Sequence, residues 1–155
     1  MTDSQPRMGT QDATGVAGGE EVPGVNFEAA DGPSGGSWTI IVPAPCKFIN
    51  LNSRTHWAPK AQLTRAWRNA AHVAARNANL PKGLENVHVV AHIIKATGRE
   101  YDVHNLMPTL KAAIDGLVTD YGLIPDDTNK HLTGPDLRQG GKGPAAIRIT
   151  ITEEV

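Results

Sequence analysis

Two helical segments alternate with short β-branched runs between residues 38 and 155, and this alternation limits the chain to a fold of mixed helix and sheet. The β-branched runs predict strands over 38–42, 87–96, near 130–133 and over 146–152. Apolar side chains recurring every three to four residues predict helices over 59–79 and 106–121. The order β-α-β-α-β-β predicts an α+β fold, a small mixed β-sheet with two main helices packed on it. The glycine-rich stretch 134–144 is expected to be a flexible loop.

The first 37 residues differ in composition from the rest of the chain. They hold half of all the glycines, and their large apolar side chains form one weak cluster of Val22, Val25 and Phe27. Such a segment buries too little apolar surface to offset the backbone entropy lost on folding, about 1–2 kcal/mol per residue. We therefore predict a disordered acidic tail over 1–37 and one compact domain over 38–155.

The formal charge of −1 is an average over two unlike parts of the chain. Residues 1–37 carry six acidic side chains and one arginine, which leaves the region 38–155 at +4. A mildly basic domain suits an anionic partner such as nucleic acid. We expect the tail to be a plain extension, and the alternative is that it folds back over the basic surface and competes with that partner.

Several classes of protein are excluded by what the sequence lacks. Cys46 is the single cysteine, so an intrachain disulfide framework is excluded. No apolar run approaches the roughly 18–20 residues that a membrane span needs. The first residues also lack the basic and then apolar pattern of a secretory signal. We therefore expect a soluble, cytoplasmic protein with no membrane partner.

Positive side chains gather on one face of the predicted helix 59–79 and in the loop before it. Arg65, Arg68, His72 and Arg76 fall within one sector of that helix, opposite its apolar face. A solvated helix face is the simpler interpretation, and a face that meets phosphates is the alternative. The candidate contacts to a nucleic-acid backbone are Lys47, Arg54, Arg65, Arg68 and Arg76.

Two histidines, His88 and His92, share one face of the predicted strand 87–96 because side chains alternate along a strand. A metal pair is conceivable there. Histidines so placed more often serve as ordinary surface or core residues.

Acidic residues mark both ends of the second predicted helix. Asp102 and His104 precede it, and Asp126 and Asp127 come where the chain returns after it. These side chains converge if the next strand runs back alongside. Carboxylates are natural ligands of Mg²⁺ or Mn²⁺, which activate water and neutralise phosphate charge. The alternative is structural, with Asp102 or Asn105 as the cap of the second helix and 125–127 as an ordinary turn.

Three pieces of this region, 102–106 (D-V-H-N-L), 110–117 (L-K-A-A-I-D-G-L) and 125–127 (P-D-D), together resemble the RusA-type Holliday junction resolvases. The family pattern joins D-x-D-N-L, a K-A-x-x-D-x-L helix, an aspartate pair and a closing strand that ends in T-I-T-E, as 150–153 does here. The resemblance covers roughly residues 38–154. It implies a RusA-like fold and a small dimeric endodeoxyribonuclease of the kind common in phages.

Carried over residue by residue, the resemblance implies metal-binding acids at Asp102 and Asp127, with Asp126 as the alternate, and a catalytic lysine at Lys111. His104 stands where the family has the second acid of D-x-D, and it is carried over as a metal ligand. An imidazole suits Mn²⁺ better than Mg²⁺, and compared with an acid at this position it removes one negative charge from the site. Lys111 follows His104 by seven residues, close to two helical turns. Its structural alternative is an ion pair with the residue four positions on.

The sequence therefore predicts an endonuclease that depends on Mg²⁺ or Mn²⁺ and resolves four-way junctions or other branched DNA. A homodimer is implied, because symmetric cutting needs two sites related by a two-fold axis. Such a protein would act in DNA recombination or repair in a bacterium or a phage-infected cell. One alternative is a DNA-binding protein that keeps the fold and has lost catalysis, as His104 suggests. Another is a nuclease of the same chemistry that acts on flaps or single strands.

Overall fold

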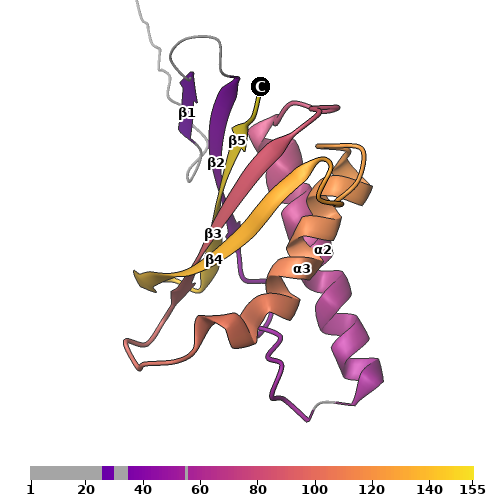
Figure 1. Ribbon diagram of the computed structural model, residues 1–155. Helices are drawn as coiled ribbons and strands as arrows, with labels where there is room; N and C mark the ends of the chain where they lie inside the picture. Colours follow the sequence, from indigo (N-terminus) through magenta and orange to yellow (C-terminus); the bar gives the residue numbers. More distant parts are fainter. Residues whose placement is uncertain (1–25, 30–34, 55) are drawn as a thin grey trace, which may run out of the picture.

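The computed structural model describes residues 26–29, 35–54 and 56–155 (Figure 1). Its strands are β1 Asn26–Ala29, β2 Gly36–Pro43, β3 Val87–Lys95, β4 Leu132–Lys142 and β5 Ala146–Glu153. Its helices are α2 Trp57–Ala78, the 3₁₀ turn η3 Val103–Leu106, α3 Met107–Asp115 and the π-helical turn η4 Gly116–Tyr121. The α+β class and the predicted element order over 38–155 are confirmed.

The five strands form one mixed sheet in the order β1-β2-β5-β3-β4. Every neighbouring pair is antiparallel except β3 and β4, which run parallel. Parallel neighbours need a crossover, and the segment of η3, α3 and η4 supplies it. Both α2 and α3 lie on one face of the sheet, so the other face carries no described helix (Figure 1).

The core fills the space between that sheet face and the two helices. Alternate strand residues point into it and are almost fully buried: Ile40, Val42, Val87, Val89, Ala91, Ile93, Ile147, Ile149 and Ile151. Trp67 of α2 is completely buried, stacks on Phe48 at a centroid distance of 5.3 Å and donates its indole N–H to the carbonyl of Lys47 at 3.0 Å. The loop after β2 is thereby tied to the helical layer.

The buried face of α2 differs from the predicted one. The predicted face ran through Leu63, Ala66, Trp67, Ala70, Ala74 and Ala78, whereas the buried residues are Trp67, Ala71, Ala75 and Ala78. The face is displaced because α2 packs against η4 as well as against the sheet. Where the two elements meet, a Cβ on Gly116 would lie 2.1 Å from the carbonyl oxygen of Arg68. In the second helical segment, by contrast, the whole predicted apolar stripe is buried: Leu106, Leu110, Ala113, Ile114, Leu117 and Tyr121.

The prediction of a flexible loop over 134–144 was wrong, because most of this segment is strand β4. Parallel pairing with β3 sets the register, with Val90 opposite Asp136 and His92 opposite Arg138. A register shift between His88 and Val90 takes up the extra length near Gly134, whose φ of 91° suits glycine. The hydrogen-bonding edge of β3 outweighs the low strand propensity of the local sequence.

One short part of the predicted tail is also a strand. Residues 26–29 form β1 and pair with β2, with Asn26 opposite Thr39 and Ala29 opposite Gly36. The folded part of the chain therefore begins before residue 38. Residues 1–25 and 30–34 lie outside the described residues, so disorder there stays a prediction.

Candidate active site

The first half of the candidate site is the turn η3, which begins at Asp102. The Asp102 carboxylate accepts a hydrogen bond from the backbone N–H of His104 at 3.0 Å, so it caps the turn as the structural alternative predicted. The same carboxylate oxygen lies 3.5 Å from Nδ1 of His104. Both side chains are well exposed, which leaves them accessible to a ligand.

Buried Thr109 holds the start of α3 against the loop that follows β2. Its hydroxyl accepts from the Ile49 N–H at 2.7 Å and donates to the Ile49 carbonyl at 2.9 Å. The Leu51 N–H donates to the Asn105 carbonyl at 2.8 Å in the same junction. These bonds orient the segment that carries both Asp102 and Lys111.

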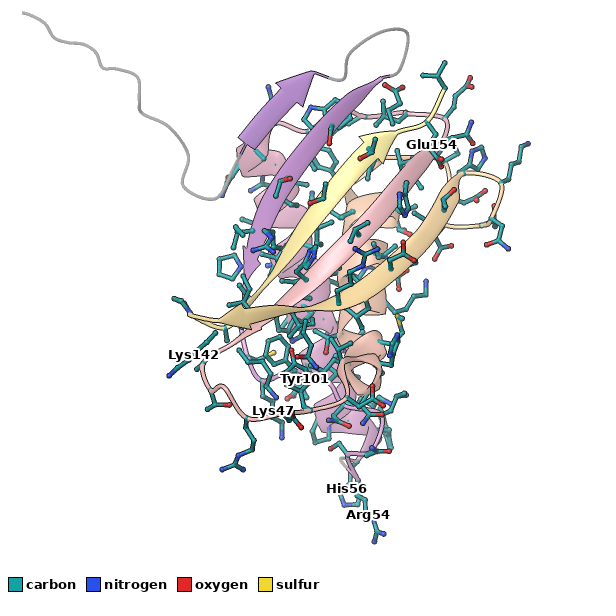
Figure 2. All side chains as sticks on the ribbon, turned by 60° about the vertical axis from the view of Figure 1, so that its left-hand side comes forward. Lys47, Arg54, His56, Tyr101, Lys142 and Glu154 are labelled. Atoms are coloured by element: carbon teal, nitrogen blue, oxygen red, sulfur yellow. The ribbon has the colours of Figure 1, made fainter. Side chains whose placement is uncertain are left out.

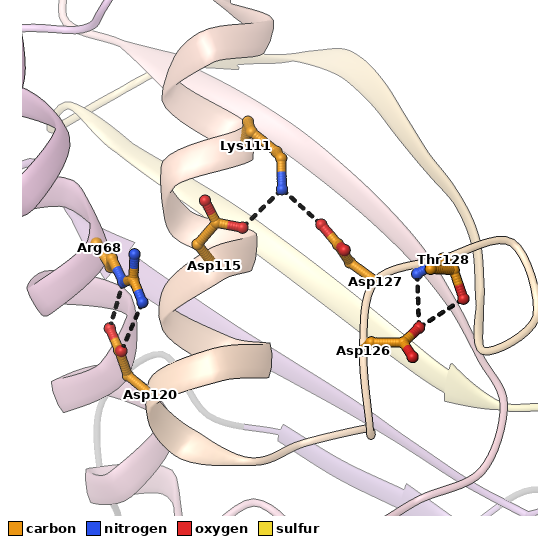
Figure 3. A network of polar contacts seen from close by, with 7 residues as sticks. All are labelled: Arg68, Lys111, Asp115, Asp120, Asp126, Asp127 and Thr128. Atoms are coloured by element: carbon orange, nitrogen blue, oxygen red, sulfur yellow. Dashed lines mark hydrogen bonds and ion pairs between the residues drawn. The ribbon is translucent and has the colours of Figure 1, made fainter.

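Lys111 links α3 to the turn that follows the second helical segment (Figure 3). Its ammonium group donates to Asp115 Oδ1 at 2.7 Å and to Asp127 Oδ2 at 2.5 Å. Both hydrogen bonds, that to Asp115 first, raise the pKa of Lys111, so its positive charge is secure at neutral pH. The i,i+4 pair with Asp115 is present, and the chain does return after the helix to bring Asp127 beside it.

The return itself follows from the end of the helical segment. Gly122 has a φ of 91°, and the Leu123 N–H donates back to the Leu117 carbonyl at 3.0 Å, as in a glycine-terminated helix. Leu123 and Ile124 are then buried, which presses the following turn against the domain. As a result Asp127 reaches α3.

Asp126 and Asp127, which the sequence left as alternates, have different surroundings. Asp126 Oδ1 accepts from the backbone N–H of Thr128 at 2.9 Å and from its hydroxyl at 2.5 Å. These hydrogen bonds lower the pKa of Asp126 and leave it as the carboxylate that shapes the turn. Asp127 is the one that faces Lys111 and is more shielded from solvent (Figure 3).

The predicted ligands thus fall into two groups. Asp102 lies with His104, and Asp127 lies with Lys111 and Asp115. Within the described part of the chain, no three His, Cys, Asp or Glu side chains are gathered so that they could hold a metal ion together. The sequence predicted Asp115 only as the i,i+4 alternative partner of Lys111. In the structure Asp115 and Asp127 both hold the Lys111 ammonium group, and the K-A-x-x-D spacing was the signal for the contact with Asp115.

The predicted basic stripe on α2 is interrupted by an acid from another element. Arg68 makes a two-pronged ion pair with Asp120, at 2.7 Å from Nε and 2.9 Å from the terminal nitrogen (Figure 3). The guanidinium holds the pKa of the Asp120 carboxyl below its usual value. Arg68 is therefore the weakest of the proposed phosphate contacts. The others are exposed: Lys47, Arg54, Arg65 and Arg76. Arg54 lies at the tip of the loop that leads into α2 (Figure 2).

The two histidines of β3 do not act as a pair. His88 Nε2 lies 2.8 Å from the carboxylate of Asp136 on β4. His92 instead lies between Arg138 and Arg148, which flank it on the neighbouring strands. The metal-pair interpretation receives no support from these contacts.

None of the helices in the described ranges is both long and apolar enough to cross a membrane. The chain matches no protein-family model, and it matches no curated protein.

Proposed function

We propose that this protein is a metal-dependent endonuclease that cuts branched DNA, with four-way junctions as its substrate and a homodimer as its working form. The observation that carries the proposal is the contact of Lys111 with Asp127. These residues are 16 positions apart, and each belongs to a different piece of the resolvase-like pattern. Their meeting beside an exposed surface supports a shared role.

The residues present suit a divalent cation. Asp115 and Asp127 already hold one cationic group between them, and carboxylate oxygens are the ligands that Mg²⁺ and Mn²⁺ prefer. Asp127 and Asp102 would hold the ion, with His104 as a further ligand and Asp126 as the alternate. Because Asp102 with His104 and Asp127 with Asp115 form two separate groups in this structure, binding one ion between them would require the two groups to move together. When bound, the ion would supply charge neutralisation at the phosphate and a more acidic water.

The roles of the protein's own groups follow from their contacts. Lys111 stays protonated, because its hydrogen bonds to Asp115 and Asp127 raise its pKa, and its ammonium group could donate to a phosphate oxygen or the leaving oxygen if Asp127 held an ion. Asp115 keeps Lys111 oriented, because it holds the same nitrogen from one helical turn away. Lys47, Arg54, Arg65 and Arg76, which are exposed, would bind the DNA backbone.

The test is cleavage of a synthetic four-way junction with Mg²⁺ or Mn²⁺. Wild type is expected to cut it, and Asp102→Asn and Asp127→Asn are expected to abolish cutting while junction affinity is kept. Glu85→Gln is the matched control, because Glu85 is an exposed acid outside both groups of site residues and its exchange should leave cutting unchanged. If wild type leaves the junction uncut with every metal tested, the proposal that the protein is an endonuclease is overturned.

A second function is favoured by one observation, the histidine at position 104. If that histidine has cost the protein its catalysis, the chain is a junction-binding protein that keeps the fold. Wild type would then bind junctions without cutting them, and His104→Asp would create cleavage. Cleavage by wild type that His104→Asp does not increase would reject this alternative.

A further inference from the structure

The sheet face turned away from the helices is a surface that the proposed site does not use. Side chains alternate along each strand, so the partners of the buried residues point to this open face, which lies in front of the helices in Figure 2. The pairing registers place them in rows that cross the strands. One of these rows is strongly basic.

This basic row consists of Arg148 on β5, His92 on β3 and Arg138 on β4. His92 lies directly opposite Arg148 in the antiparallel pair and opposite Arg138 in the parallel pair. Adjacent strands are about 4.8 Å apart, so the two arginine backbones are separated by about 10 Å. Arg138 is exposed and Arg148 is half-buried, so both side chains are at least partly accessible from the open face.

His92 is the unusual member of the basic row. Its Nδ1 is buried and has no hydrogen-bond partner among the described residues. Burial first, and then the charges of Arg148 and Arg138, lower the pKa of this imidazole. Two positive groups are thus held around a third basic residue, an arrangement that a bound anion would relieve.

Acidic groups near the basic row are engaged elsewhere. Asp136, two positions before Arg138 on β4, lies against His88 at 2.8 Å. Glu154 accepts from the Thr133 hydroxyl at 2.6 Å at the far end of the sheet. The row beside the basic row carries the hydroxyl pair Thr39–Thr150 together with Asp136, and the pair Ser37–Thr152 lies one row further on. Guanidinium groups and hydroxyls are the usual donors to phosphate oxygens.

We propose that the basic row is a second nucleic-acid surface, which binds phosphodiester groups of a DNA segment other than the one at Lys111. A polyanion is favoured over a small anion, because the two arginines stand on β5 and β4 with β3 between them, so that separate phosphate groups could reach each of them. Lys111 and the basic row lie on opposite sides of the sheet, so a branched DNA with several arms could reach both. The inference takes DNA as partner from the proposed function, but it does not require cleavage.

The experiment measures affinity for a labelled four-way junction against salt concentration, with the full chain. Arg138→Gln/Arg148→Gln is expected to weaken binding at least about tenfold at low salt and to reduce the salt slope by about two, one for each lost phosphate contact. Lys82→Gln/Lys130→Gln removes the same charge from outside the basic row and should keep the wild-type slope. Arg138→Gln alone is expected to lower the salt slope by about one. Because Arg138 is exposed, this single variant replaces the double variant in the experiment if the double variant does not fold.

An unchanged slope in the variants of the basic row, or an equal fall in the lysine control, would overturn the inference. The cleavage assay separates this failure from that of the proposed function. If wild type cuts junctions and the variants of the basic row bind them normally, only the inference about the basic row is rejected. Wild type that binds no DNA would reject both.

Discussion

At the scale of single residues, the polar groups that matter most are those with a defined partner far away in sequence. Lys111 meets Asp127, and Thr109 meets Ile49, 60 positions away. Asp127 and Lys111 are both partly exposed, so their ion pair adds little stability. The ion pair matters because it holds the turn that carries Asp127 beside Lys111 of α3. The Thr109 bonds are buried, and there a missing partner leaves the backbone of Ile49 without a substitute from water.

We predict that Thr109→Val destabilises the fold by about 1–3 kcal/mol, although the two side chains have nearly the same shape. The variant leaves the N–H and the carbonyl of Ile49 unpaired in a buried place. Urea unfolding of the purified variant measures the change. Thr64→Val is the matched control, because that hydroxyl only bonds to the Lys60 carbonyl in its own helix. Equal losses in the two variants would contradict the role given to Thr109.

At the scale of elements, the close approach of α2 to η4 decides how the helical layer packs. Gly116 lies at the contact and opens η4, whose π-helical turn ends at Tyr121. The Tyr121 hydroxyl donates to the Leu80 carbonyl, so the end of η4 is also tied to the chain that follows α2. This packing positions the segment that carries Asp127 with respect to Lys111.

We predict that Gly116→Ala is destabilising by about 1–3 kcal/mol. Alanine is the better helix former by about 1 kcal/mol, but its Cβ would lie 2.1 Å from a backbone carbonyl oxygen of α2. The steric cost exceeds the propensity gain because backbone cannot move aside as a side chain can. Gly98→Ala, where a Cβ would meet nothing within 4 Å, should be nearly neutral. Thermal unfolding of both variants checks this, and a stabilised Gly116→Ala would show that the helices can separate freely.

At the scale of the whole molecule, the sheet divides the proposed functions between its two faces. The helical face carries Lys111 and its carboxylates, and the open face carries the basic row. A formal charge of −1 for the whole chain reveals neither arrangement. What matters to a polyanion is the local grouping of charges, since exposed charges more than about 10 Å apart are largely screened at physiological salt.

We predict that mixed dimers of wild type with excess Asp127→Asn nick a four-way junction without cutting the opposite strand. In the proposed mechanism each protomer of a dimer supplies one site, so a dimer with one inactive partner is expected to make one incision. Denaturing and native gels distinguish nicked from fully resolved junctions, and sedimentation checks that the protein is dimeric. Paired incisions from mixed dimers, or a monomer that cuts both strands, would contradict the proposed symmetric mechanism.

The sequence by itself determined the α+β class, the order of elements, the stripe of the second helix and its end at Gly122. These features depend on local periodicity and on turn residues, which neighbouring positions encode. The separate surroundings of Asp126 and Asp127, the pairing of Arg68 with Asp120 and the strand over Leu132–Lys142 were decided only by the tertiary structure. The basic row could not be predicted from the sequence either, because it too depends on the tertiary structure. Arg138 and Arg148 meet His92 through the register of three strands, and register is set by how the whole sheet packs on its helices.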